Sequence, residues 1–155
     1  MNMRTPQEIE SLAWDRLDEA RILYENNKFD GAFYFAGYAV ELILKVRICE
    51  LFDIPNLFEE SGQSASITIG IGELRRSVKI HNLQMLLVYS GLKKKFDTMV
   101  LSDPDFENIN SYLIQKWSER SRYHLTGTIQ PIIIQRILEL LGDRTKGILQ
   151  WLLEN

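Results

Sequence analysis

Residues 30–52 read DGAFYFAGYAVELILKVRICELF, and this stretch decides the fold of the chain. Apolar and aromatic residues would cover nearly every side of the helix that it forms, which is typical of a helix at the centre of a bundle or inside a membrane. Glu41, Lys45 and Arg47 interrupt the apolar run, so no window reaches the roughly 18 to 20 uncharged residues of a membrane span. We therefore predict the buried central helix of a helical bundle and no membrane insertion.

Glu41 is the exception on this helix, because a buried carboxylate needs a cation or hydrogen-bond donors, or else it is protonated. Lys45 follows one turn later, in the favourable Glu-before-Lys order. Arg122 is the partner that we favour, because a guanidinium can bind a carboxylate through two hydrogen bonds while it stacks on Tyr123 or Trp117. We expect Glu41 to contact Arg122 across the bundle and to orient it; the alternative is a purely structural ion pair.

Composition limits the classes of function. The 155 residues, 45% of them hydrophobic, are enough for one sizeable core, so we expect a single domain over residues 1–155. A net charge of −3 creates no general attraction for nucleic acid, and any phosphate site must come from a local cluster. The lone Cys49 excludes an intrachain disulfide and a cysteine-based zinc site. Residues 1–10 contain no apolar signal segment, so the cytoplasm is the expected compartment.

Helical periodicity continues on both sides of the central stretch. Thr5 to Glu8 has the form of a capping box and predicts a first helix over about residues 6–26, antiparallel to a central helix capped by Asp30. Four further helices are expected. The first starts after Asn82 and ends at Ser90, the second follows Lys93, and the third runs from Pro104 towards Trp117. The last is expected to run unbroken from about residue 128 to Leu152, through Gly142 and Gly147.

Residues 55–80 lose this period and gather Ser, Gly and polar residues. Within them, residues 66–72 read SITIGIG, in which isoleucine alternates with small residues as in an extended strand. A short hairpin, an edge that pairs with another chain and a mobile flap all remain open. The predicted fold is thus all-α, an up-and-down bundle of about four to five helices with a long irregular insertion.

The candidate ligand-binding residues concentrate in one short segment. Arg120, Arg122, Tyr123 and His124 supply cations, a donor and aromatic faces, a set suited to a phosphate with a stacked base. A polar turn with one structural arginine is the alternative. His124 would need a second group within reach to act as a general acid or base.

Other polar clusters carry weaker predictions. Arg75, Arg76 and Lys79 form a secondary basic cluster, and His81 beside it is expected to be a capping or surface residue. Lys93 to Lys95 form a third cluster. The two histidines have no acidic residue at ligand spacing, and no glycine-rich phosphate loop is present, so neither a metal nor a cofactor is predicted.

Three segments together resemble the HEPN superfamily of small helical-bundle proteins: DGAFYFAGYAVELILKVRIC at 30–49, HNLQMLLVYSGL at 81–92, and WSERSRY at 117–123 with the helix that closes the chain. The resemblance covers nearly the whole chain. It implies a helical bundle, frequent homodimerisation and a polar site where the central helix meets the arginine segment. It also implies links to nucleotide binding, RNA cleavage or toxin–antitoxin pairs.

The sequence departs from this family at one important place. HEPN ribonucleases pair an arginine with a histidine after a spacer longer than the three residues between Arg120 and His124, and no histidine follows His124. We therefore expect a non-catalytic domain that binds a nucleotide or RNA through Glu41, Lys45 and the arginine segment, or the partner of a nucleotidyltransferase-type protein. A metal-independent endoribonuclease toxin that uses Arg120 and His124, and a protein-interaction module, are the alternatives.

Overall fold

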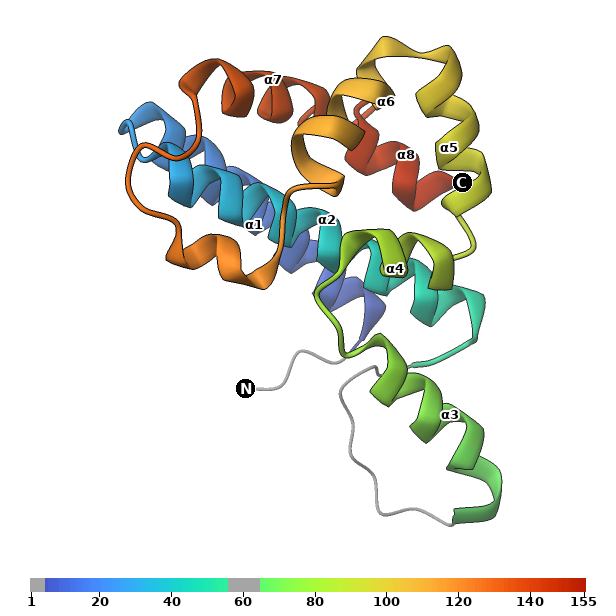
Figure 1. The fold of residues 1–155 in the computed structure, drawn as a ribbon. Coiled ribbons are helices and arrows are strands. Elements are labelled where there is room, and N and C mark those ends of the chain that lie inside the picture. Colours follow the sequence, from blue (N-terminus) through green and yellow to red (C-terminus); the bar gives the residue numbers. More distant parts are fainter. Residues whose placement is uncertain (1–4, 56–64) are drawn as a thin grey trace.

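The computed structural model describes residues 5–55 and 65–155, and all regular structure in these residues is helical, which confirms the all-α prediction (Figure 1). Short helices make their number larger than expected. The described α-helices are α1 Pro6–Glu25, α2 Phe29–Leu51, α3 Ala65–Val78, α4 Leu83–Tyr89, α5 Lys93–Ser102, α6 Pro104–Ile109, α7 Pro131–Leu141 and α8 Ile148–Glu154. A π-helical turn, η1 Asn110–Ile114, and a 3-10 helix, η2 Glu119–Tyr123, complete the regular structure.

Helices α1 and α2 form the predicted antiparallel hairpin (Figure 1). The capping box is present: the Thr5 hydroxyl accepts from the Glu8 backbone N–H, and the Glu8 carboxylate accepts from the Thr5 N–H. Asn27, with a φ of 59°, makes the tight turn between the helices. The apolar face of α1 then lies against α2 through Ile9, Ala13, Leu17 and Ala20, all of which are fully buried.

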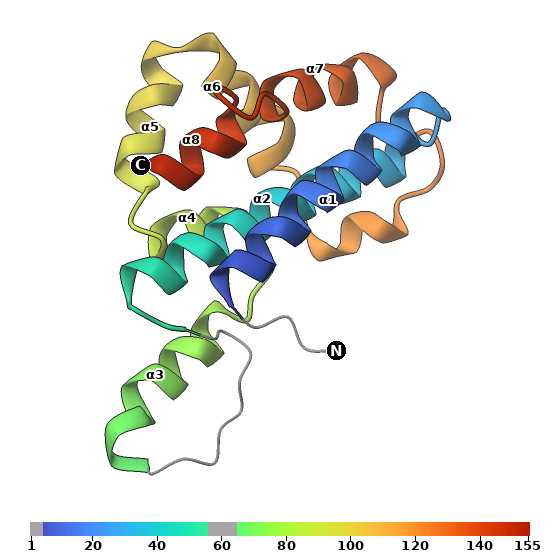
Figure 2. The ribbon, with the colours of Figure 1, turned by 180° about the vertical axis from the view of Figure 1, so that it is seen from behind.

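Helix α2 is the buried centre of the molecule, as predicted. Helices α1, α4, α7 and α8 and both short helices, η1 and η2, pack against it (Figures 1 and 2). The eight consecutive residues from Ala39 to Val46 are all buried, and together they cover every side of the helix. This packing explains why its sequence is apolar all round rather than on one stripe. None of the helices in residues 5–55 and 65–155 has the length and apolarity required to cross a membrane.

The predicted starts of two further helices are confirmed. The Asn82 side chain accepts from the Met85 N–H at the start of α4, and the Asp103 side chain accepts from the Asp105 N–H at the start of α6. Asp30, however, is not the cap of α2, which begins at Phe29. Its carboxylate instead reaches a distant loop, where it forms one wall of the candidate site.

The prediction of one continuous closing helix is wrong, because the chain turns between α7 and α8. One carboxylate oxygen of Asp143 accepts from the backbone N–H groups of Thr145 and Lys146 and from the Thr145 hydroxyl. These local bonds replace the helical ones. A Cβ on Gly147 would lie 2.5 Å from the Asp143 carbonyl oxygen and 2.7 Å from that of Leu141, so the turn requires glycine here.

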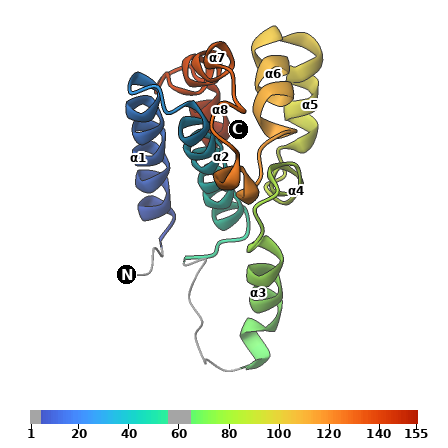
Figure 3. The same ribbon diagram turned by 60° about the vertical axis from the view of Figure 1, so that its left-hand side comes forward.

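The extended segment predicted at residues 66–72 is also wrong, because these residues belong to helix α3. Ile67, Ile71, Leu74 and Val78 recur at helical spacing, and the alternation of isoleucine with small residues hid this second pattern. Helix α3 extends away from the other helices (Figure 3), and the fully buried Val78 joins it to them. The rest of the predicted insertion, residues 56–64, lies outside the described residues.

Candidate ligand-binding site

Glu41 is buried in the middle of α2, with 1% of its surface exposed, and among the described residues its carboxylate contacts Lys45 and His81. The Lys45 ammonium lies 2.8 Å from one carboxylate oxygen. The Nδ1 atom of His81, in the linker between α3 and α4, lies 3.1 Å from both oxygens. Lys45 is thus the partner that helical spacing made available, and His81 is the second.

The predicted contact between Glu41 and Arg122 is wrong. Arg122 is exposed, and its guanidinium lies over the ring of Tyr123, 5.0 Å from the ring centroid. The electrostatic interaction with Tyr123 is also the main reason why the pKa of Arg122 is raised above its ordinary value. The physical reason is the geometry of η2: Ser121 is the residue that faces the core, at 2% exposure, and its neighbours Arg120 and Arg122 therefore point to solvent.

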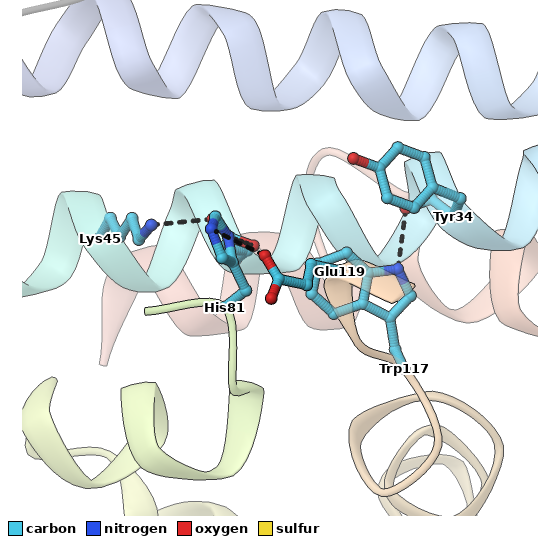
Figure 4. A network of polar contacts seen from close by, with 6 residues as sticks. Tyr34, Lys45, His81, Trp117 and Glu119 are labelled. Atoms are coloured by element: carbon cyan, nitrogen blue, oxygen red, sulfur yellow. Dashed lines mark hydrogen bonds and ion pairs between the residues drawn. The ribbon is translucent and has the colours of Figure 1, made fainter. Parts of the chain in front are cut away.

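His81 is a site residue that the sequence analysis missed. Its ring is half-exposed, and Nε2 lies 3.4 Å from a carboxylate oxygen of Glu119, the first residue of η2. The ring therefore bridges α2 and η2 (Figure 4). Asn82, as predicted, caps α4. His81 is exposed, as expected of a surface residue, but its contacts with two carboxylates were not predicted.

Trp117 fixes the start of η2 against α2. Its indole N–H donates to the backbone carbonyl oxygen of Tyr34 at 2.9 Å. The indole also stacks on the phenol ring of Tyr34, with centroids 6.0 Å apart (Figure 4). Gly37 makes room for the indole, because a Cβ at that position would overlap it. The Ser118 and Ser121 hydroxyls then cap η2 by accepting from backbone N–H groups. The segment that carries Arg120 and Arg122 is thereby held at a defined place on α2.

His124 follows directly after η2 and lines an open pocket of about 380 Å³. Its imidazole ring stacks against Phe33 of α2, with centroids 6.2 Å apart and an interplanar angle of 23°. Lys116 supplies a cation, Tyr112 a hydroxyl and Gln130 an amide to the same pocket. The pocket therefore joins aromatic faces with one positive charge and neutral hydrogen-bonding groups.

Asp30 holds one wall of this pocket. Its two carboxylate oxygens accept from the backbone N–H groups of Gly127 at 2.8 Å and Ile129 at 2.9 Å. Gly127 has a φ of +92°, which glycine adopts without strain. The loop that leads from η2 to α7 is thus tied to the first turn of α2.

The structure brings only part of the predicted site together. Arg120, Arg122 and Tyr123 lie on the segment that enters the pocket at His124, but they do not line it. Glu41 and Lys45 belong to the buried network instead. Tyr112, Lys116 and Gln130 were not predicted, because no spacing in the sequence connects them to His124.

The secondary basic cluster lies at the end of α3 and in the residue after it, away from the pocket. Arg75 and Arg76 are in the last turn of α3, where Arg76 pairs with Glu73, and Lys79 follows, exposed. Two effects act on the Cys49 thiol. Burial raises the pKa of Cys49 to about 11, and the positive charge of Arg75 partly opposes this rise. Cys49 and Phe33, which lines the pocket, are 16 residues apart and thus roughly 24 Å apart along α2.

Two lysines at the start of α5, Lys93 and Lys95, have partners of their own. Lys93 pairs with Asp97, and the Lys95 ammonium donates to the backbone oxygen of Asn155. Within the described ranges, no three His, Cys, Asp or Glu side chains are grouped so that they could hold a metal ion.

The fold and the pocket together define an all-helical protein built around one buried helix, with an open aromatic and cationic pocket beside the amino-terminal half of that helix. Comparison with protein-family models, with curated proteins and with solved structures finds no match to the chain.

Proposed function

We propose that the protein is a non-catalytic domain that binds a nucleotide or RNA at the His124 pocket, in agreement with its resemblance to the HEPN superfamily. One observation carries the proposal: Lys116, His124, Tyr112 and Phe33 converge on one open pocket from three separate segments of the chain. Sites of this kind bind a phosphate through the cation and a base through the aromatic faces.

Each group has a role in this proposal. Lys116 attracts a phosphate, and Tyr112 and Gln130 offer hydrogen bonds to a base or a sugar. The imidazole of His124, backed by Phe33, offers a stacking surface at the pocket. Pockets of a few hundred Å³ hold small molecules, so one nucleotide unit fits.

The exposed residues before the pocket extend the same surface. Tyr123 is 72% exposed, and the Arg122 guanidinium already lies on its ring. A second base can stack on Tyr123 while Arg120 and Arg122 contact the neighbouring phosphates. This continuation favours a ligand longer than one nucleotide, such as a single-stranded RNA.

The surroundings of His124 support binding rather than catalysis. A general acid or base needs a second group in hydrogen-bond reach, and among the described residues the His124 side chain stacks on Phe33 and no hydrogen bond or ion pair positions it against Arg120. The endoribonuclease alternative with Arg120 and His124 thus finds no positioned pair. On the resemblance alone, we also propose a cytoplasmic homodimer that pairs with a nucleotidyltransferase-type protein, as in toxin–antitoxin systems.

Titration of the full chain with ATP and with a short single-stranded RNA tests the proposal. We expect Lys116→Met and His124→Ala each to weaken binding by roughly tenfold or more, the effect of about 1.4 kcal/mol. Lys146→Met, at an exposed lysine in the turn between α7 and α8, is the matched control and should leave binding unchanged. If the wild-type chain binds neither probe, the proposal is wrong and an interaction module is favoured. RNA cleavage that His124→Ala abolishes would instead support the ribonuclease.

A further inference from the structure

His81 stands between two carboxylates that belong to different parts of the fold. Its Nδ1 lies 3.1 Å from both oxygens of the buried Glu41, and its Nε2 lies 3.4 Å from an oxygen of Glu119 (Figure 4). The second distance is that of an ion pair rather than of a short hydrogen bond. Each ring nitrogen therefore faces a group that can only accept when ionised.

The protonation state of the ring decides whether both contacts are attractive. A neutral imidazole carries one N–H, so whichever tautomer forms, one ring nitrogen presents a lone pair to a carboxylate. Two acceptors that face each other repel. The imidazolium ion has an N–H on both nitrogens and a positive charge, and it alone makes both contacts favourable.

Charged groups from two elements surround the ring. Helix α2 contributes Glu41 and Lys45, whose charges cancel, and η2 contributes Glu119. Tyr38, one turn before Glu41, remains a neutral phenol, because burial and then the charge of Glu41 raise its pKa. Among the described residues, the ion-pair partner of Glu119 is His81, which supplies a positive charge when it is protonated.

We propose that His81 is a proton-dependent clamp. As imidazolium it contacts both Glu41 and Glu119, and it thereby ties the linker between α3 and α4 to both α2 and η2. As neutral imidazole it keeps only the contact with Glu41. The buried end of the clamp is fixed, because Glu41 is held by Lys45 in either state. The exposed end is the part that opens.

The clamp would regulate the ligand site, and this role rests on the proposed function above. Glu119 is the first residue of η2, and the same short helix carries Arg120, Arg122 and Tyr123 and leads into His124. Loss of the proton leaves Glu119 as an unpaired negative charge next to these arginines. That charge repels an anionic ligand and competes with it for the guanidinium groups.

Nuclear magnetic resonance of the full chain tests the clamp without any ligand. The His81 ring nitrogens and the backbone amides of η2 are followed from about pH 5 to about pH 9, the range in which histidines titrate. We expect the amides of Glu119 and Ser121 to shift with the same midpoint as the His81 ring. Glu119→Gln removes the charge and keeps the shape of this exposed side chain. In this variant the His81 ring should still titrate, but the chemical shifts of the η2 amides should no longer change with its midpoint. Amides that ignore the His81 titration in the wild type, or that follow it equally in Glu119→Gln, would overturn the clamp.

A second measurement tests the regulation. The affinity for a short single-stranded RNA should fall roughly two- to fivefold in the wild type as His81 loses its proton, the scale of one surface ion pair. Glu119→Gln should flatten this part of the pH profile, and because both proteins contain His124, its own titration cancels in the comparison. Equal profiles would refute the regulatory role. Absence of RNA binding in both would refute the proposed function, while the resonance experiment still decides the clamp.

Discussion

The Lys45 ammonium lies 2.8 Å from a carboxylate oxygen of Glu41, and the side chains of Lys45 and Glu41 are 4% and 2% exposed. A charged pair this deep in the core contributes little net stability, because both ions lose their hydration. Its members nevertheless depend strongly on each other. Two charges also occupy the centre of the helix around which the other helices pack.

Replacement of Lys45 by methionine tests this dependence. Glu41 would keep only the contact with His81, and we expect the free energy of unfolding to fall by about 3 kcal/mol, the lower end of the range for a broken buried pair. Urea denaturation measures the change. Lys93→Met is the matched control, because Lys93 and Asp97 form an exposed pair at the same spacing, and it should cost less than about 1 kcal/mol. Equal losses in the two variants would contradict the assignment of Glu41 and Lys45 as a buried pair.

Gly37→Ala tests the packing of the Trp117 indole against the α2 backbone at Gly37. The added Cβ would overlap the indole, which must then move and release its hydrogen bond to the Tyr34 carbonyl. We expect a loss of about 1–3 kcal/mol in the free energy of unfolding, together with a change in tryptophan fluorescence.

The control for this variant is Gly70→Ala, in helix α3, where a Cβ has no neighbour within 4 Å. Alanine there should be neutral or stabilising by about 0.5–1 kcal/mol. An equally tolerated Gly37→Ala would show that the indole is not held against the α2 backbone.

Asp30→Ala tests the wall of the pocket. The backbone N–H groups of Gly127 and Ile129 would lose their acceptor, and we expect a cost of about 1–3 kcal/mol in the free energy of unfolding. Hydrogen exchange at these two amides should become faster, and ligand binding at the pocket should weaken with it.

Asp143→Ala serves as the comparison, because Asp143 also accepts from backbone N–H groups but lies in the turn between α7 and α8. It should leave exchange at Gly127 and Ile129 unchanged. Unchanged exchange in Asp30→Ala itself would mean that Asp30 does not hold this loop.

Cys49 makes stability depend on pH in the alkaline range. Burial raises the pKa of its thiol from an ordinary value of 9.0 to about 11. Below pH 9 the thiol is neutral in both the folded and the unfolded chain, and its contribution is fully present. As the pH rises from 9 to 11 the unfolded chain loses the proton first, so the stability contributed by the neutral thiol is lost.

We expect this loss to be on the order of 2 kcal/mol. Unfolding of the wild type and of Cys49→Ala at pH 8 and at pH 11 isolates it, because Tyr38 and the lysines titrate in both proteins. The stability difference between the two proteins should shift against the wild type by that amount. A difference that does not change with pH would show that the thiol is not buried as described.

Much of the fold follows from interactions within three or four residues of the chain. The caps at Thr5 and Asn82, the helix start at Pro104 and the apolar sides of α2 are of this kind, and all were predicted correctly. The helix α3 and the turn after α7 were not. In both places two local patterns overlap. Val78 is buried where α3 joins the other helices, and after α7 the local bonds of Asp143 and the close approach at Gly147 select the turn over a continuous helix.

The contacts of the candidate site also fall into two kinds, those set by spacing on one helix and those set by tertiary packing. Lys45 lies one helical turn from Glu41, so its pairing follows from spacing on a single helix. Arg122 and His81 compete for Glu41 over long distances in the sequence, and the outcome depends on which residue of η2 faces the core and on the path of the linker before α4. The pocket of Lys116, His124 and Phe33 likewise exists only once α2, η1 and η2 are packed together. Residue spacing carries no information about such meetings, because side chains from separate segments become neighbours only when the core has formed.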